Sequence, residues 1–264
     1  SDVKAGQVVL HKGMRLGAAQ LGLAAMVGAS RVRVFAAPRV AVLATGDEIV
    51  PFDQKPGKTQ MRNSNSLMLM ALLRRLGCVA TDLGWVPDQE RLIRETLGRG
   101  MQFDALLVTG GMSMGRHDYV PRLLKELGVQ MKITKLRIKP GKPFVFGISP
   151  GGCPVFGLPG NPVSGFVCTT RLVSRLLTRL GGGGVEERWV QGKLLSPLAA
   201  NDAREFYQPV VLEYGTQEIG VRPLRWKGSA DLWTLAQANG LMVRRENEAA
   251  LPAGARVRVL IAGC

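Results

Sequence analysis

The segment Gly157–Ser164 (GLPGNPVS) places two glycines and two prolines between an apolar run and a stretch with helical spacing. The first N–H groups of a helix have no carbonyl partner, and the helix dipole is positive at that end. Such a turn can bind an anion, with polar side chains that cap the helix and donate to a ligand. The candidate ligand contacts of the turn are Pro159, Gly160, Asn161, Pro162 and Ser164. An ordinary strand-to-helix turn with a proline near the first helical position is the alternative.

A second polar segment, Thr45-Gly46-Asp47-Glu48, directly follows an apolar run. Two adjacent carboxylates at the end of a strand can hold a hard cation such as Mg²⁺ through oxygen ligands. We therefore treat all four residues as candidate ligand contacts. A turn that carries two solvated acids is the alternative.

A third segment is a glycine-rich loop, TGGMSMG, which begins at Thr109 and is closely followed by Asp118. Its glycines let the backbone approach a ligand, while the serine and the exposed amides can donate to phosphate. The candidate contacts of this loop are Thr109, Gly110, Gly111, Ser113 and Gly115. Asp118 is a second candidate metal carboxylate, beside Glu48.

A fourth segment is basic. Lys135, Arg137 and Lys139 alternate along a stretch that we expect to be one strand over 129–138, and Lys142 follows. Residues two apart in a strand share one face, so these cations would lie together. That cluster is costly unless an anion or carboxylates compensate it. Ordinary surface lysines are the alternative.

Together these segments predict a site for a polyanion with one or more metal ions. No serine–histidine–aspartate arrangement is credible, because the chain has only two histidines, His11 and His117. A Walker phosphate-binding loop is absent from the sequence. The four cysteines form no C-x-x-C pair, which argues against a zinc or disulfide framework and indicates a reducing, cytoplasmic location.

Alternating elements must position these segments. Strands are expected at 39–45, 78–83, 104–109, 129–138, 144–148 and 155–158, and helices at 67–76, 88–97, 119–127 and 163–180. This order predicts an α/β domain over 39–181, with three layers and a mainly parallel sheet. Ligands of such sheets bind at the carboxyl ends of the strands, where the candidate segments fall.

The flanking regions differ from this pattern. In the leader over 1–38 we expect strands at 8–10 and 32–35 and a buried helix at 17–28. A glycine run at 181–184 precedes a region over 185–264 with short alternating apolar runs. We expect that region to be a small all-β barrel.

The net charge of +15 is uneven. Residues 1–184 carry 25 lysines and arginines against 11 acids, whereas residues 185–264 carry 10 against 9. Either a nucleic-acid partner or a substrate with phosphate or oxyanion groups can account for this excess. No basic run exceeds two residues and no basic residues alternate with aromatics, so nucleic-acid binding is poorly supported. No apolar run reaches about 18 residues, and we expect no membrane partner.

The segments TGDE, TGGMSMGRHDY, KLRIKPGKP and GLPGNPVS, in this order between about 39 and 180, resemble the MoeA/gephyrin E-domain family of molybdopterin molybdenumtransferases. The β region is also similar to the last domain of that family, with Arg204 and Gly228-Ser229 at its arginine and serine motifs. Related molybdopterin adenylyltransferases share the TGG and PGNP loops but lack the barrel, so the barrel favours the MoeA type.

The resemblance implies insertion of molybdenum from molybdate into adenylylated molybdopterin, with release of AMP. It makes Glu48, Asp88 and Asp118 the site acids and Lys135 and Lys139 the site lysines. The acids would hold Mg²⁺ beside the pyrophosphate, and the turn at 160–164 would hold the pterin phosphate.

The family likeness also implies a cytoplasmic homodimer and contact with the pathway's adenylyltransferase. Family members carry a further N-terminal region, which in the dimer completes the cleft of the partner. Since this chain opens in the middle of the family pattern, we expect a fragment that binds ligand yet turns over poorly. The alternatives are a molybdopterin adenylyltransferase and a ligand-binding or scaffold fragment.

Overall fold

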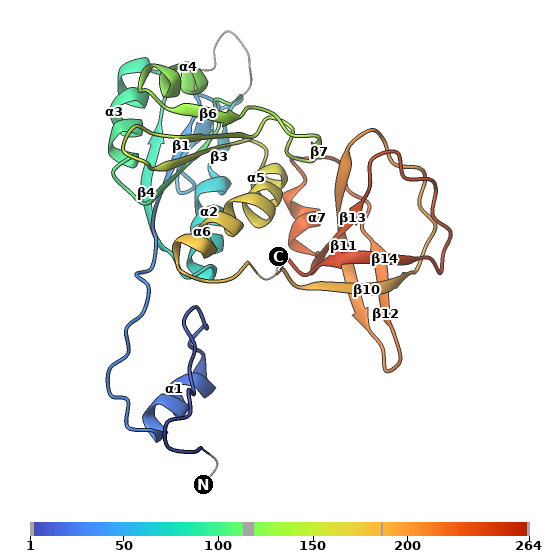
Figure 1. Ribbon diagram of the computed structural model, residues 1–264. Coiled ribbons are helices and arrows are strands. Elements are labelled where there is room, and N and C mark those ends of the chain that lie inside the picture. Colours follow the sequence, from blue (N-terminus) through green and yellow to red (C-terminus); the bar gives the residue numbers. More distant parts are fainter. Residues whose placement is uncertain (1–2, 113–118, 186, 263–264) are drawn as a thin grey trace.

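The computed structural model describes residues 3–112, 119–185 and 187–262. An α/β domain and a β barrel lie side by side, and the leader extends away from both (Figure 1).

The α/β domain is built on a six-stranded sheet with the order β4-β1-β5-β9-β8-β6. The strands are β4 (Val79–Val86), β1 (Arg39–Thr45), β5 (Ala105–Thr109), β9 (Pro154–Leu158), β8 (Val145–Ile148) and β6 (Gln130–Ile133). The first four are parallel, and β8 and β6 each run antiparallel to the preceding neighbour. The three central strands are buried almost throughout, which explains their continuous apolar sequences. The prediction of a mainly parallel three-layer domain is confirmed.

Helices cover both faces of this sheet. One face packs against α3 (Glu90–Gly100) and α4 (Tyr119–Glu126). The other packs against α2 (Ser64–Arg75), α5 (Pro162–Cys168) and α6 (Ser174–Leu180). A π-helical turn over Thr169–Val173 joins the last two helices. The expected helix at 163–180 is therefore one helical run with a wider turn at its middle.

The side chains of β1 alternate between the two cores. Val40 and Val42 pack toward α2, whereas Ala41 and Leu43 pack toward α3 and α4. Helix α2 begins three residues earlier than expected, because Asn63 caps it by accepting a hydrogen bond from the Ser66 amide at 3.1 Å.

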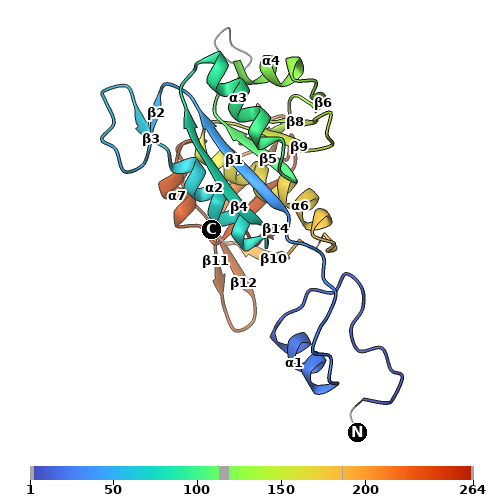
Figure 2. The same ribbon diagram turned by 90° about the vertical axis from the view of Figure 1, so that its left-hand side faces the viewer.

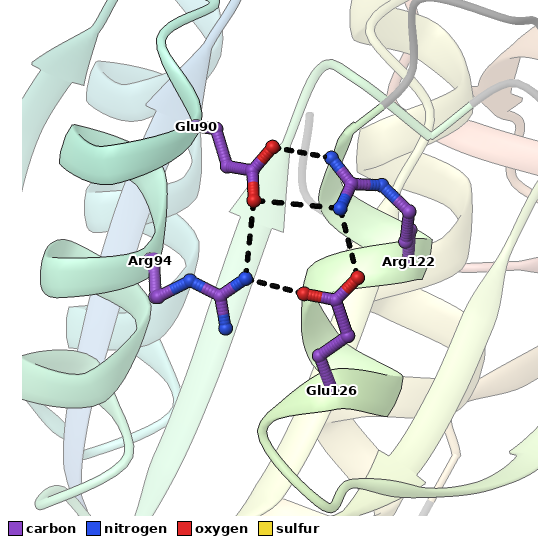
Figure 3. Close-up of polar contacts among 4 residues, drawn as sticks. All are labelled: Glu90, Arg94, Arg122 and Glu126. Atoms are coloured by element: carbon purple, nitrogen blue, oxygen red, sulfur yellow. Dashed lines mark hydrogen bonds and ion pairs between the residues drawn. The ribbon is translucent and has the colours of Figure 1, made fainter.

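Four charged residues join α3 to α4 (Figure 3). Glu90 and Arg94 come from α3, and Arg122 and Glu126 come from α4. Arg122 lies 2.6 Å from Glu90 and 2.8 Å from Glu126, and Arg94 pairs with the same two carboxylates. We call this set the ion-pair network. It links two helices whose first residues follow candidate site segments.

The C-terminal region is a closed barrel of five strands, as predicted. The strands are β10 (Trp189–Leu194), β14 (Arg256–Leu260), β13 (Gly240–Arg244), β11 (Glu205–Tyr214) and β12 (Ile219–Pro223). Strand β12 closes the ring because it pairs with both β10 and β11. A short helix that the sequence analysis did not predict, α7 (Leu232–Ala236), is capped by Asp231.

The barrel and the α/β domain share a hydrophobic core. Val163 and Phe166 of α5 pack with Tyr207, Leu241 and Leu235 of the barrel region. In addition, the two-residue strand β7 (Ile138–Lys139) pairs with β11.

A half-buried arginine reinforces this contact between the domains. Arg171, in the π-helical turn, pairs with Glu187 and donates to the Tyr207 hydroxyl at 2.9 Å. Burial, together with the hydrogen bond to Glu205, raises the pKa of Tyr207 to about 12. The tyrosine hydroxyl therefore stays neutral at physiological pH and acts as a fixed hydrogen-bond partner.

The prediction of one strand over 129–138 is wrong. Strand β6 ends at Ile133, and the chain then turns, with the Leu136 amide bonded to the Lys142 carbonyl at 3.0 Å. The chain next forms β7, which belongs to the barrel sheet. Lys135, Arg137 and Lys139 therefore do not lie along one strand.

The leader also differs from its prediction. Helix α1 (Ala18–Met26) forms where expected, but the expected strands at 8–10 and 32–35 are absent from the described leader. In α1 only Ala24 is buried. The helix lies apart from both domains (Figure 2), so it is not the buried helix expected. Apolar runs become strands only when a partner strand supplies a hydrogen-bond ladder, and none of the described strands lies beside these runs. A separate two-stranded sheet, β2 (Ile49–Val50) with β3 (Met61–Arg62), protrudes elsewhere from the α/β domain.

Candidate functional site

Three predicted segments meet at one edge of the large sheet. Strands β1, β5 and β9 are parallel neighbours, so the residues after Thr45, Thr109 and Leu158 emerge together. Strand β4 ends at the same edge, because Val86 pairs with Thr45, and Asp88 follows it closely. This edge, with the loops at 45–48, 109–111 and 159–161, is the candidate site.

Two glycines allow the first and second loops to touch. Gly110 has a φ of +90°, and a Cβ atom there would lie 2.0 Å from the Thr45 carbonyl oxygen. A Cβ atom on Gly111, with a φ of +59°, would lie 2.8 Å from Thr45 Oγ1. Only glycine combines this backbone conformation with so close an approach.

Asn65, near the start of α2, joins the second and third loops. Its side-chain Nδ2 donates to Thr109 Oγ1 at 2.9 Å and to the Gly160 carbonyl oxygen at 2.7 Å. Sequence reasoning did not identify this asparagine as a site residue. The available signal was the presence of this second asparagine after the capping residue Asn63. The signal does not reveal the partners of Asn65, because they are distant in sequence.

The acids of the first loop lie at the surface of the site. The Asp88 amide donates to Asp47 Oδ1 at 3.0 Å, which connects the ends of β1 and β4. The Glu48 carboxylate lies over Gly46, where an added Cβ would be 2.4 Å from Oε2. Trp85 Nε1 fixes the same turn by donating to the Gly46 carbonyl oxygen at 2.7 Å.

Three predicted site residues, Ser113, Gly115 and Asp118, lie outside the described residues. Of the two predicted metal ligands, Glu48 and Asp118, the structure therefore describes only Glu48. Within the described ranges, no group of three or more histidine, cysteine, aspartate or glutamate side chains could hold a metal ion.

The PGNP turn is bound to the barrel. Asn161 Nδ2 donates to Ser229 Oγ at 2.8 Å, and the Val163 amide donates to the Ser229 carbonyl oxygen at 3.1 Å. Asn161 precedes the helix but makes no side-chain capping bond, so its predicted capping role is wrong. Ser229 of the barrel instead accepts hydrogen bonds from the Asn161 side chain and from the Val163 amide. Pro159, Pro162 and Ser164 complete the turn, and Ser164 is buried.

The basic segment meets the barrel at a shared acid. Lys139 Nζ lies 3.2 Å from Asp202 Oδ2 and 4.9 Å from the centre of the Phe206 ring. Arg204 lies 3.4 Å from the same Asp202 oxygen. Loss of hydration raises the pKa of Asp202, but Lys139 and Arg204 outweigh this effect, so its pKa lies below the ordinary value. Lys139 and Arg204, both predicted, are thus brought together.

The other cations of this segment divide into two groups. Arg137 pairs with Glu246 of the barrel region at 2.5 Å. Lys135 and Lys142 are exposed. The segment leaves the sheet where β6 ends and returns where β8 begins, at the edge that carries the candidate site. Carboxylates therefore compensate part of the basic cluster.

Two family models match the chain. The first, a probable molybdopterin binding domain, matches residues 41–179, and the second, the MoeA C-terminal region (domain IV), matches residues 191–262. The chain belongs to the MoeA/gephyrin family. The first model covers the candidate loops and the basic segment, and the second covers Arg204 and Ser229.

Individual relatives agree with this membership of the MoeA/gephyrin family. Molybdopterin molybdenumtransferases of Synechocystis sp. and Haemophilus influenzae are each 31% identical, over 96% and 98% of this chain. Gephyrin of Dictyostelium discoideum is 29% identical over 100% of the chain and is matched over 42% of its own length. The chain spans 63% and 64% of the two molybdenumtransferases.

A solved structure has the same fold. The crystal structure of the molybdopterin biosynthesis MoeA protein from Pyrococcus horikoshii superposes with a TM-score of 0.86 at 30% identity. The match covers 99% of this chain and 63% of that one. No helix in the described part of the chain is long and apolar enough to span a membrane.

Proposed function

We propose that this chain inserts molybdenum from molybdate into adenylylated molybdopterin and releases AMP, as a step of molybdenum cofactor biosynthesis. The observation that carries the proposal is the contact of Asn161 in the PGNP turn with Ser229 of the barrel. The loops alone suit any enzyme that binds molybdopterin, including an adenylyltransferase. A barrel residue at the phosphate-binding turn favours the MoeA type of reaction.

In this proposal, the three loops hold the two ends of the substrate. The turn at 160–164 takes the pterin phosphate, and the glycines at 110 and 111 let the backbone lie against the pyrophosphate. Ser229 presents Asn161 toward the ligand. Arg204 and Lys139 come from two domains and share Asp202, so their charges face one position. Oriented donors and cations of this kind stabilise negative charge that develops on a transferring phosphate.

Molybdate is an anion, and exposed cations attract it to the site. Lys135 and Lys142 have exposed side chains in the basic segment, near the edge where the loops meet. Clustered charge of one sign raises the local concentration of a substrate of opposite sign. We propose that these two lysines capture molybdate. Lys139 would bind the phosphate group at the bond that is cleaved.

Mg²⁺ is the proposed metal ion. In proteins it is usually held by one or two carboxylates together with substrate phosphates, rather than by a complete protein cage. The exposed Glu48 carboxylate at the mouth of the site suits such a role, with Asp118 as the second carboxylate. Bound Mg²⁺ would neutralise pyrophosphate charge. Asp88 would fix the first loop through its amide contact with Asp47.

We also propose that the protein works as a cytoplasmic homodimer. Leu21, Met26, Val34 and Phe35 are exposed apolar side chains in the leader, with exposures between 51% and 66%. Apolar side chains exposed in this number on one short segment are consistent with a protein partner that covers them. A second copy of the chain and the pathway's adenylyltransferase are the proposed partners.

The test is incubation of the chain with adenylylated molybdopterin, molybdate and Mg²⁺, with AMP release followed by chromatography. We expect release that depends on molybdate, and a loss of about 100-fold in Glu48→Gln, comparable to removal of one stabilising group. A matched control is Glu95→Gln, a surface acid on α3 away from the site. If ATP is consumed and adenylylated product accumulates instead, the chain is an adenylyltransferase. If neither reaction occurs but the ligand binds, the chain is a binding fragment.

A further inference from the structure

Asn65 has one polar side-chain atom that no described residue pairs with. The Oδ1 atom of Asn65 is buried, and no hydrogen-bond donor within the described residues reaches it. The Nδ2 atom of the same amide makes two hydrogen bonds, at 2.7 and 2.9 Å. An amide that is satisfied on one side and unsatisfied on the other, at the edge where ligand loops meet, indicates a missing donor.

The orientation of this amide is fixed by its neighbours. The Gly160 carbonyl oxygen can only accept a hydrogen bond, so the atom that faces it at 2.7 Å must be Nδ2. The oxygen Oδ1 therefore faces elsewhere and can only accept. Thr109 Oγ1 accepts from Nδ2, so its own hydroxyl hydrogen can be donated to another group.

The two side chains thus present an acceptor on Asn65 and a donor on Thr109. An ionised phosphate has oxygens that only accept, so it would be repelled by the acceptor of Asn65. A heterocycle edge that carries an N–H group beside an acceptor matches both. The pterin ring and the adenine ring of the proposed substrate both have such an edge.

We infer that Asn65 is a specificity residue that accepts a hydrogen bond from an N–H group on a heterocycle of the ligand, and that Thr109 and Gly160 position it. The inference rests on the proposed function for the identity of the ligand. It places the edge of a ring, rather than a phosphate, at the side chains of Asn65 and Thr109, whereas the backbone of the second and third loops faces the phosphates.

The experiment measures dissociation constants of the full chain by calorimetry for three probes: 6-hydroxymethylpterin, AMP and inorganic pyrophosphate. In Asn65→Ala we expect binding of one ring-bearing probe, or of both, to weaken by roughly 10- to 100-fold, as for a lost hydrogen bond that leaves its partner unpaired. Binding of pyrophosphate should change by less than about threefold. A loss for pterin alone assigns the pterin ring, and a loss for AMP alone assigns adenine.

Two further variants keep the test decisive. Asn63→Ala removes the cap of the same helix, so it should lower stability while leaving all three affinities unchanged. Thr109→Val keeps the shape of the side chain and removes the hydroxyl that positions Asn65, so it should weaken the same ring-bearing probe as Asn65→Ala. If Asn65→Ala fails to fold, Thr109→Val tests the same inference.

Three outcomes would overturn the inference. Equal weakening of all probes would assign a general structural role to Asn65, and weakening of pyrophosphate alone would assign it to phosphate. Unchanged affinities would exclude contact with the ligand while leaving the proposed function intact. If the unaltered chain binds none of the probes, the proposed function fails, and the inference fails with it.

Discussion

Asn161 of the PGNP turn donates its side-chain amide to Ser229 Oγ of the barrel at 2.8 Å, across a separation of 68 residues. The Val163 amide donates to the carbonyl of the same serine. The barrel therefore holds the turn in place through one side-chain contact and one backbone contact. Only the side-chain contact can be removed by substitution, so its contribution can be measured alone.

Ser229→Ala removes the oxygen that receives the Asn161 amide and keeps the backbone contact. We expect kcat/KM for AMP release to fall by roughly 10-fold, the effect of about one hydrogen bond. The melting temperature should stay within about 2 °C, because the contact is exposed. Ser196→Ala, at an exposed barrel serine, is the control. An unchanged kcat/KM would show that the contact does not orient the turn.

Gly110→Ala tests the close approach of the first two loops. The Cβ would meet the Thr45 carbonyl oxygen at 2.0 Å in a backbone conformation that disfavours side chains. We expect the free energy of unfolding in urea to fall by about 2–5 kcal/mol, from backbone strain and overpacking together. Gly77→Ala is the matched control, because Gly77 has a φ of +81° with open space around it. Gly77→Ala should lower the free energy of unfolding only by the cost of backbone strain, about 1–2 kcal/mol. Equal losses would contradict the close contact.

Much of this architecture follows from local sequence. The strand at 39–45 was predicted to the residue, because a fully buried parallel strand needs a continuous apolar run. Placing the candidate loops at one edge needed only the rule for parallel sheets. The barrel strands were found because their short apolar runs alternate and are separated by turn residues.

The remaining features depend on contacts between distant residues. The link from Asn65 to Gly160 spans 95 residues, and no local pattern indicates it. The strand expected over 129–138 is divided because Ile138 and Lys139 pair with β11 of the barrel and form a separate edge strand there. The same barrel takes the Asn161 side chain that local chemistry assigned to a helix cap.

The ion-pair network should stabilise the pair of helices in a pH-dependent way. Hydrogen bonds from Arg122 and Arg94 hold the pKa of Glu90 below its usual value of 4.5, and the same two arginines lower the pKa of Glu126. A carboxylate with a lowered pKa in the folded state contributes stability above its unfolded pKa. That stability is lost as the pH falls through the folded pKa.

A double-mutant cycle with Glu90→Gln and Arg122→Met, measured by urea unfolding, tests this expectation. The coupling should be present at pH 7, should shrink in 1 M NaCl, and should vanish well below pH 4. The isolated pair of Arg91 and Glu95 on the same helix gives a matched control cycle with weaker coupling. A network coupling no larger than that of the isolated pair, at every pH, would contradict cooperation among the four residues.

Arg171→Met tests the joint between the domains. The substitution leaves the half-buried carboxylate of Glu187 without its main partner and removes the donor to Tyr207. We expect the free energy of unfolding to fall by about 2 kcal/mol, between the cost for an exposed pair and the cost for a buried one. Arg175→Met, an exposed arginine near the same carboxylate, should cost less than about 1 kcal/mol. Similar costs for both would show that burial of Arg171 does not matter.

Transfer of molybdenum by this chain is the central consequence of the proposed function. The direct measurement is a single-turnover reaction with adenylylated molybdopterin, Mg²⁺ and molybdate labelled with radioactive molybdenum, in which pterin-bound label and free AMP are both quantified. We predict that label and AMP appear together in equal amounts, and that both are lost in Lys139→Met and Glu48→Gln. Release of AMP without bound label, or transfer that persists in both variants, would contradict the account.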